Sequence, residues 1–277
     1  MIRLIVDSTF GIQKHYAEKH NIKIVRLKMI LGEEVFDEGF EDTYDEFYEK
    51  MKTSKHFPTT SQPSPQDFMD AIDEIYAEDE NAEVIILTIS NALSGTINSA
   101  TIAANSYEGK KIVAIDTREA TTCCRMMTEE IVEAINAGKT FDEILELIKI
   151  LQQKLQIDFI PDTMDALKRG GRIGGLTATV ANILKIKPIF RFADGKIRVI
   201  KKVLGFSKAI SDAVAEIPKK LKKLYVCYIH DNSNVQKIID KIKNVIGITN
   251  IETVPIEPVF GVHVGIAAVG IASLEQY

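Results

Sequence analysis

The chain has few of the residues that build disulfide frameworks or metal sites. Its 277 residues include only three cysteines, Cys123, Cys124 and Cys227, which is too few for a set of paired bridges. The adjacent pair Cys123 and Cys124 lacks the spacing of metal ligands. None of the five histidines lies at such a spacing from another histidine or from a cysteine. We therefore predict buried, structural cysteines and no metal site.

The sequence also lacks long apolar runs and an excess of positive charge. It contains no window of about 18 uninterrupted apolar residues, and residues 1–10 lack the regions of a signal peptide. The net charge is −5, whereas a nucleic-acid-binding protein needs a concentrated basic surface. These absences predict a cytoplasmic protein with no nucleic-acid partner and no stable membrane insertion.

The order of the predicted elements indicates two domains in an α/β protein. In the first half, apolar runs that predict strands alternate with helical patterns, and these runs cover residues 2–6, 22–29, 84–89 and 111–115. This alternation is typical of a mostly parallel sheet with helices on both faces. After residue 157 the pattern changes to α+β with hairpins. We expect an α/β (Rossmann-like) domain over residues 1–157 and an α+β domain over residues 158–277.

Several local signals give sharper expectations. Thr43 with Glu46, and Thr140 with Glu143, have the spacing of capping boxes at helix starts. Three prolines in residues 57–65 predict a stiff loop in place of a regular element. The remaining expectations are a hairpin over residues 188–203 turned by Asp194-Gly195, a helix over residues 176–184, and strands over residues 251–256 and 264–271.

The most informative stretch covers residues 84–98. A buried strand ends there in a polar loop that opens a helix, and the first N–H groups of a helix lack partners and carry partial positive charge. Ser94, Gly95 and Thr96 add hydroxyls and close backbone approach at this point. The stretch can therefore hold an anion. The alternative is that Ser94 is an ordinary helix N-cap, for which serine is a preferred residue.

Other polar residues follow the remaining strands of the predicted parallel sheet. Asp7, Ser90 and Asp116 stand at strand ends, and ligands of such sheets bind outside the carboxyl ends of the strands. Two hydroxyl-rich loops, residues 59–64 and 90–96, would border the same crevice, with His263 and a glycine-rich loop from the second domain. Neither hydroxyl-rich loop contains a cation. Neutral hydroxyls and free N–H groups suit a single carboxylate better than a phosphate.

Motifs for catalysis and nucleotide binding are missing or incomplete. Gly138-Lys139-Thr140 lacks the earlier glycine of a phosphate-binding loop, and residues 170–175 lack the glycine order of a dinucleotide fingerprint. Ser94 lacks the flanking glycines of a nucleophile elbow. An alternative that stays open is a small hydrolase or phosphotransferase that uses Ser94 with Asp7 or Asp116 and His263, brought together by folding.

Six segments taken together resemble the DegV family, the fatty-acid-binding subunits of bacterial fatty acid kinases. In chain order they are Asp-Ser-Thr at residues 7–9, Thr-Thr-Ser-Gln-Pro-Ser-Pro at 59–65, Ile-Ser-Asn-Ala-Leu-Ser-Gly-Thr at 89–96, Asp-Thr at 116–117, Leu-Lys-Arg-Gly-Gly-Arg-Ile at 167–173 and Lys-Ile-Lys-Pro-Ile-Phe at 185–190. The resemblance implies a two-domain protein with a long-chain fatty acid between its domains, the second domain covering the lipid.

The resemblance also implies that lipid binding and catalysis belong to separate subunits. The chain would bind the lipid without catalytic residues or a cofactor of its own, and a separate ATP-dependent kinase subunit would form the acyl phosphate. Thr60 and Ser94 match the hydroxyls that hold the carboxylate, Ser61 and Gly95 lie beside them, and His263 aligns with a histidine of the family near the C-terminus.

Two positions depart from the family pattern. Gly265-Ile266-Ala267 stands where the family has glycine-proline-glycine, and Leu204 stands where it has an arginine after Lys-Val. The expectation is that lipid binding is intact and that coupling to a kinase is the step affected. A fatty-acid sensor without a kinase partner is the corresponding alternative.

Overall fold

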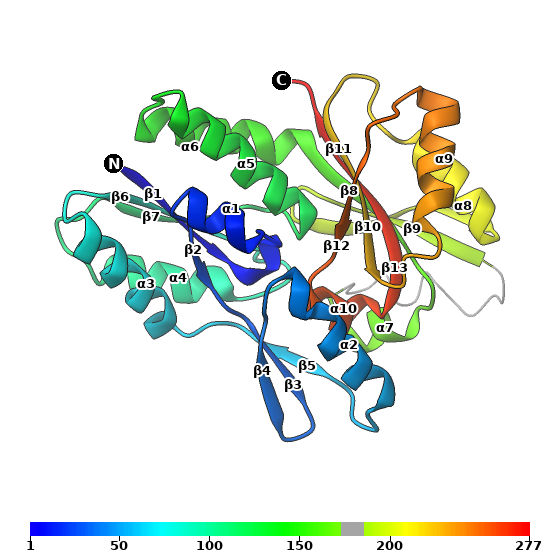
Figure 1. Ribbon diagram of the computed structural model, residues 1–277, viewed down its shortest axis with the longest axis horizontal. Helices are drawn as coiled ribbons and strands as arrows, with labels where there is room; N and C mark the ends of the chain where they lie inside the picture. Colours follow the sequence, from blue (N-terminus) through cyan, green and yellow to red (C-terminus); the bar gives the residue numbers. More distant parts are fainter. Residues whose placement is uncertain (173–185) are drawn as a thin grey trace.

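The computed structural model describes residues 1–172 and 186–277 and arranges them around two main sheets (Figure 1). The predicted helix over residues 176–184 lies outside the described residues. The first main sheet has the strand order β2-β1-β6-β7, and its pairings are all parallel. Its strands are β1 (Ile2–Asp7), β2 (Lys23–Val25), β6 (Glu83–Thr88) and β7 (Ile112–Asp116). The predicted N-terminal parallel sheet is therefore confirmed.

Helices cover both faces of this sheet, as predicted. Successive residues of a strand point to opposite faces, so Ile5 and Ile86 join one apolar cluster and Val6 and Leu87 join another. The first cluster lies under α3 (Pro65–Glu78) and α4 (Thr96–Asn105). The second lies under α1 (Lys14–Lys19), α5 (Thr122–Asn136) and α6 (Phe141–Lys154).

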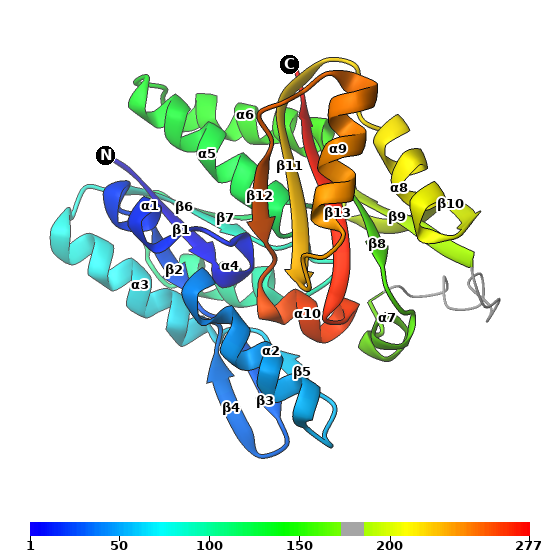
Figure 2. The same cartoon turned by 45° about the vertical axis from the view of Figure 1, so that its right-hand side comes forward.

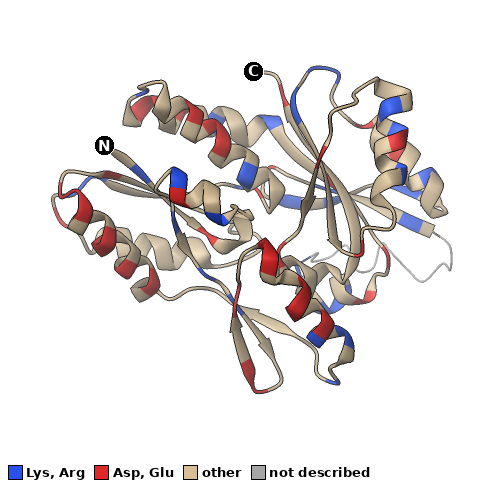
Figure 3. Cartoon of the chain, viewed as in Figure 1, with Lys and Arg blue, Asp and Glu red and all other residues tan. Residues whose placement is uncertain are grey.

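The helix α3 illustrates how the sequence selects these faces. Phe68, Ile72 and Ile75 recur at a spacing of three or four residues and are buried against the sheet. Its acidic residues are marked in red along the helix in Figure 3, and all of them except Asp67 are exposed. This amphipathic pattern fixes the rotation of the helix because turning it would expose the apolar stripe to water.

The second main sheet has the strand order β10-β9-β8-β13-β11-β12. Neighbouring strands are antiparallel except β11 and β12, which are parallel. The strands are β8 (Leu155–Pro161), β9 (Ile186–Ala193), β10 (Lys196–Leu204), β11 (Leu221–His230), β12 (Glu252–Pro255) and β13 (Ala267–Glu275). The predicted α+β character of the second half is confirmed, whereas the domain boundary at residue 157 stays a prediction.

Helices also cover both faces of the six-stranded sheet. One face packs against α8 (Phe206–Ala215) and α9 (Val235–Ile246). The other face packs against α5, which therefore lies between the two main sheets. A single apolar cluster consequently runs from the parallel sheet through α5 and α6 to the six-stranded sheet.

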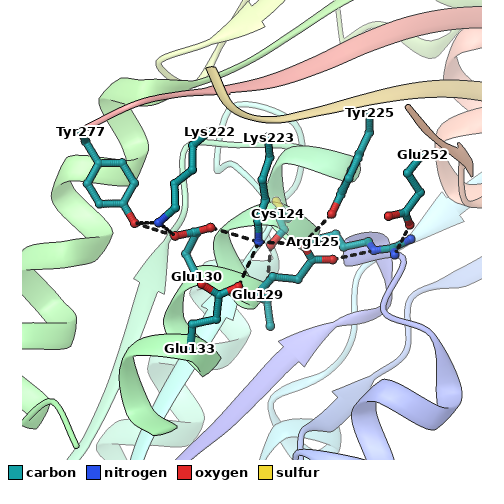
Figure 4. A network of polar contacts seen from close by, with 11 residues as sticks. Cys124, Arg125, Glu129, Glu130, Glu133, Lys222, Lys223, Tyr225, Glu252 and Tyr277 are labelled. Carbon is teal, nitrogen blue, oxygen red and sulfur yellow. Dashed lines mark hydrogen bonds and ion pairs between the residues drawn. The ribbon is translucent and has the colours of Figure 1, made fainter. Parts of the chain in front are cut away.

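A buried polar network also holds α5 against the six-stranded sheet (Figure 4). Lys223 Nζ on β11 lies 3.1 Å from a carboxylate oxygen of Glu129 and 3.0 Å from one of Glu130. The Tyr277 hydroxyl donates to Glu130 at 2.6 Å, and Lys222 pairs with the same carboxylate. The Glu130 side chain is only 1% exposed. Three partners therefore satisfy the buried Glu130 carboxylate and join α5 to β11 and the C-terminal residue.

A third, smaller sheet corrects two expectations. Its antiparallel order is β4-β3-β5, from β3 (Lys28–Leu31), β4 (Glu34–Asp37) and β5 (Thr59–Ser61). The predicted strand over residues 22–29 is wrong because the chain divides it between β2 and β3, which belong to different sheets. The predicted stiff loop over residues 57–65 is wrong at Thr59–Ser61, because these three residues lie between prolines and keep the N–H groups that a strand pairing needs.

The predicted capping box of Thr43 with Glu46 is also wrong. A short 3₁₀ helix, η2 (Glu41–Thr43), runs directly into α2 (Tyr44–Thr53), so Thr43 already has helical dihedral angles. Its hydroxyl donates to the Phe40 carbonyl oxygen at 2.7 Å in place of capping α2. The second box, formed by Thr140 and Glu143, is present.

The chain near the C-terminus differs from expectation as well. The helix α10 (Pro258–Val264) occupies the start of the segment predicted as a strand over residues 264–271, and β13 begins later, at Ala267. The predicted turn at Asp194-Gly195 is confirmed: both residues have positive φ, 55° and 72°, as a two-residue hairpin turn requires. Among the described residues, no helix is long and apolar enough to cross a membrane.

Candidate functional site

A cavity of about 450 Å³ lies where the carboxyl end of β6 meets α10 and β5. Figure 2 shows α10 beside α7 (Asp165–Gly170) and above the β3-β4-β5 sheet. The predicted site residues all line this cavity: Thr60, Ser61, Ser94, Gly95 and His263. They come from β5, from the loop before α4 and from α10, so elements of both halves of the chain build one wall.

Thr60 and His263 form a direct link between the two halves. His263 Nε2 lies 2.8 Å from Thr60 Oγ1. Burial and the nearby positive charge of Arg172 lower the pKa of His263 to about 4, so the imidazole is neutral at neutral pH. Its buried Nδ1 atom has no hydrogen-bond partner among the described residues. The ring packs so closely on Gly170 that a Cβ atom there would lie 3.0 Å from Nδ1.

The Ser94 hydroxyl is not the cap of α4. The N-cap of this helix is Gly95, which makes no side-chain cap bond, and Ser94 Oγ lies 2.9 Å from Thr96 Oγ1. The alternative interpretation of Ser94 as an ordinary N-cap therefore receives no support. A Cβ atom at Gly95 would lie 2.4 Å from Gln62 Oε1, so a larger residue there would displace the end of the Gln62 side chain. Gln62 in turn donates to Ser99 Oγ at 3.1 Å and ties the segment after β5 to α4.

Arg172 is a cavity residue that sequence reasoning missed. The two hydroxyl-rich loops contain no cation, but folding brings this arginine into the same cavity from the glycine-rich segment. Its guanidinium donates to the Gly170 carbonyl oxygen at 2.7 Å and to the Leu93 carbonyl oxygen at 3.5 Å. An arginine beside hydroxyls and free N–H groups suits an anion. The signal in the sequence was a charged residue among glycines, without any indication of which loop it meets.

An apolar chamber of about 60 Å³ adjoins the polar cavity. Four residues line both spaces: Leu93, Ile197, Phe260 and Val264. The chamber extends from the residues just before α5 to the six-stranded sheet, where Phe159, Phe192 and Cys227 line it. Its one hydroxyl belongs to Thr121 and already donates to Glu257 Oε2 at 2.7 Å. The site therefore has a polar end next to an apolar end, which matches an amphiphilic anion.

The catalytic arrangement considered as an alternative does not form among the described residues. Asp7 is fully buried and accepts hydrogen bonds from the Ile89 N–H at 2.7 Å and from the Thr9 hydroxyl, and burial raises its pKa to about 6. Asp116 accepts from two backbone N–H groups. In residues 1–172 and 186–277, no hydrogen bond joins Ser94 to Asp7, Asp116 or His263. Ser94 therefore has no base in contact.

The position of α10 depends on a buried carboxylate. Glu38 Oε1 accepts from the Val259 N–H in the first turn of α10 at 2.8 Å, and Glu38 Oε2 accepts from the Ser8 hydroxyl at 2.6 Å. Burial raises the pKa of Glu38 to about 7. Glu38 thus fastens the start of the helix that carries His263 to the end of β1.

The two places where the sequence departs from the family pattern, Leu204 and residues 265–267, lie in different surroundings. Leu204 ends β10 with 71% of its surface exposed and is not among the described residues that line the cavity. Seven positions earlier on the same strand, Ile197 does line it, and seven residues of strand span about 24 Å. Gly265 has a φ of +100°, which favours glycine between α10 and β13.

Comparison with known proteins adds an independent finding. A family model described as "Uncharacterised protein, DegV family" matches residues 1–276. A DegV domain-containing protein of Clostridium perfringens is 31% identical over an alignment of 281 positions that covers 98% of each chain.

Solved structures give the same result. A Thermus thermophilus protein described as a fatty-acid-binding DegV family protein is 28% identical, covers 99% of each chain and has a TM-score of 0.89. DegV of Bacillus subtilis, described as a fatty acid binding protein, is 26% identical with 99% coverage of each chain and a TM-score of 0.82. A stearic-acid-binding protein of Eubacterium ventriosum is 25% identical, covers 100% of this chain and 99% of its own, and has a TM-score of 0.87. This protein belongs to the DegV family.

Proposed function

We propose that this protein binds a long-chain fatty acid and presents its carboxylate to a separate ATP-dependent kinase subunit, which forms the acyl phosphate. The observation that carries the first part is the joined site, in which a polar cavity with an arginine continues into an apolar chamber. Relatives of similar fold are described as fatty-acid-binding proteins. The chain itself would act in the cytoplasm without a catalytic residue, and residues 1–157 and 158–277 would be its two domains.

The proposed position of the ligand follows from the polarity of the site. The Thr60 and Ser94 hydroxyls would hold the carboxylate, with Ser61 and Gly95 beside them and the Arg172 charge nearby. A neutral His263 can donate one hydrogen bond to an oxygen without carrying charge. The two hydroxyls and the Arg172 charge would replace the water that a carboxylate loses on burial.

The proposed driving force is burial of the tail. About 14 methylenes at roughly 0.8 kcal/mol each provide ~11 kcal/mol before ordering and association costs are subtracted. The chamber of about 60 Å³ is small beside the roughly 300–1,000 Å³ of ordinary ligand pockets. Binding a long tail therefore requires that the chamber walls move apart, which predicts slow uptake in comparison with diffusion-limited binding.

Two experiments test the two parts separately. Organic extraction of natively purified protein followed by mass spectrometry should yield a long-chain fatty acid. The delipidated protein should then take up added fatty acid, and a primary alcohol of the same chain length, which lacks the carboxylate, is the matched control. An extract without lipid together with no uptake of fatty acid would contradict lipid binding.

The kinase part is tested by mixing the loaded protein with ATP, Mg²⁺ and a kinase subunit from the same cell, and trapping the acyl phosphate as a hydroxamate. Kinase without this protein is the control. The departures at Leu204 and at Ile266-Ala267 favour a second candidate, a fatty-acid sensor. Lipid binding without acyl phosphate formation by any kinase subunit of that cell would support the sensor in place of the kinase partner.

A further inference from the structure

Gly270 lies at the centre of the six-stranded sheet, on the face that lines the apolar chamber. It is directly opposite Phe159 on β8 and Cys227 on β11, and both of these residues line the chamber too. Its neighbours along β13, Val269 and Ile271, belong to the apolar cluster under α8 and α9 on the other face. Of these three paired residues, only Gly270 therefore contributes no side chain to the wall of the chamber.

The reason for a glycine here is space and not backbone conformation. Gly270 does not have a positive φ, so other residues can adopt its backbone geometry. A Cβ atom at this position would lie 3.2 Å from Cys227 Sγ, 3.5 Å from Phe159 Cβ and 3.1 Å from the Asp158 carbonyl oxygen. The 3.5 Å separation from Phe159 Cβ is an ordinary contact, but an added methyl group would crowd the Asp158 carbonyl oxygen and displace the Cys227 side chain, which lines the chamber. In a chamber of about 60 Å³ such a shift removes a substantial part of the space.

The order of lining residues along the chain gives the direction of a bound tail. His263 lines the polar cavity, Val264 lines both spaces, and residues 268–270 line only the chamber. A ligand whose carboxylate lies near His263 consequently reaches Val264 first and Gly270 later. A short tail would end before it meets Gly270, whereas a long tail would have to pass it.

We propose that Gly270 is the specificity-determining residue that allows long acyl tails to enter the chamber. The proposal rests on the proposed function, because it assumes that the carboxylate lies in the polar cavity. Each methylene that a narrowed chamber excludes costs about fourfold in affinity. Enlarging the residue at position 270 should therefore weaken the binding of long fatty acids and leave that of short ones almost unchanged.

The test compares decanoate with octadecanoate on delipidated full-length protein. Gly270→Ala should weaken octadecanoate by roughly tenfold or more, since only two excluded methylenes produce that loss, and should change decanoate by less than about twofold. The double variant Gly270→Ala with Cys227→Ala removes the sulfur atom that the new methyl group meets and should restore octadecanoate binding. Ile271→Val, which trims the opposite face of the same strand, is the control and should change neither affinity.

Three outcomes would overturn the proposal. If the parent binds neither fatty acid, the proposed function and this inference both fail. If the parent binds both and Gly270→Ala keeps the same ratio of the two affinities, only the role of Gly270 fails. If Gly270→Ala does not fold, Phe192→Leu replaces it: widening the same chamber should raise the preference for octadecanoate over decanoate, and an unchanged preference would overturn the proposal.

Discussion

Replacing Ser94 with alanine is the most direct test of the proposed carboxylate site. The change removes one hydroxyl that faces the polar cavity and leaves the backbone of the loop unchanged. A hydrogen bond to a charged group contributes about 1.5 to 3 kcal/mol. Ser94→Ala should therefore weaken fatty-acid binding by roughly 10- to 150-fold.

The structure also supplies a matched control for this experiment. Ser94 Oγ lies 2.9 Å from Thr96 Oγ1, and Thr96 is fully buried. Thr96→Val breaks the same hydrogen bond but keeps the Ser94 hydroxyl in the cavity. Because Gly95 and not Ser94 is the N-cap of α4, both variants should lower the stability of the delipidated protein by a similar, small amount of about 1 kcal/mol.

The assay is isothermal titration of delipidated protein with one fatty acid, beside a thermal unfolding curve for each variant. Ser106→Ala, at the far end of α4, controls for a general effect of losing a serine hydroxyl from this helix. Only Ser94→Ala should lose affinity. Equal losses of affinity in Ser94→Ala and Thr96→Val would show that the hydroxyl pair is structural, and an unchanged affinity in Ser94→Ala would remove Ser94 from the site.

Three further predictions concern coupling and pH. His263→Ala should keep fatty-acid affinity within a few fold but strongly reduce hydroxamate formation with the cognate kinase, and full turnover by this variant would exclude the imidazole from the transfer step. Leu204→Arg should leave that turnover equal or raise it, and a clear loss would contradict the assignment of this position to kinase coupling. Glu38 has a pKa of about 7 in the folded protein, against an ordinary value of 4.5. Between these two pH values the folded state binds more protons than the unfolded state. The stability that Glu38 contributes therefore falls as the pH rises through this range. The glutamine in Glu38→Gln does not titrate. Urea unfolding at about pH 5 and about pH 8 should therefore show that the variant gains stability relative to the parent at the higher pH. Parallel changes of stability with pH in the two proteins would refute the shifted pKa.

The sequence determined the features that depend on neighbouring residues. The junction of β6 with α4, the Thr140 capping box and the turn at Asp194-Gly195 all formed as predicted. In each case a few adjacent residues set the dihedral angles or supply the hydrogen bond. The alternation of strands and helices likewise fixed the class of the first half.

Expectations that depended on distant partners were less accurate. Thr59–Ser61 is a strand only because β3 lies beside it, and residues 22–29 divide between two sheets because each piece has its own partner strand. Thr43 failed as a cap because the preceding residues wound into η2. Such outcomes follow from pairings that no local window contains.

In the site, too, some features follow from the sequence and others depend on contacts between distant residues. The resemblance to the DegV family pointed to Thr60, Ser94 and His263. Folding alone brought His263 within 2.8 Å of Thr60, which is 203 residues away in the chain. Folding also brought Arg172 into a cavity whose own loops contain no cation. The size of the apolar chamber depends on side chains from five or more separate elements that pack against each other. Volumes and approaches of this kind are properties of the packed interior, so only the tertiary structure decided them.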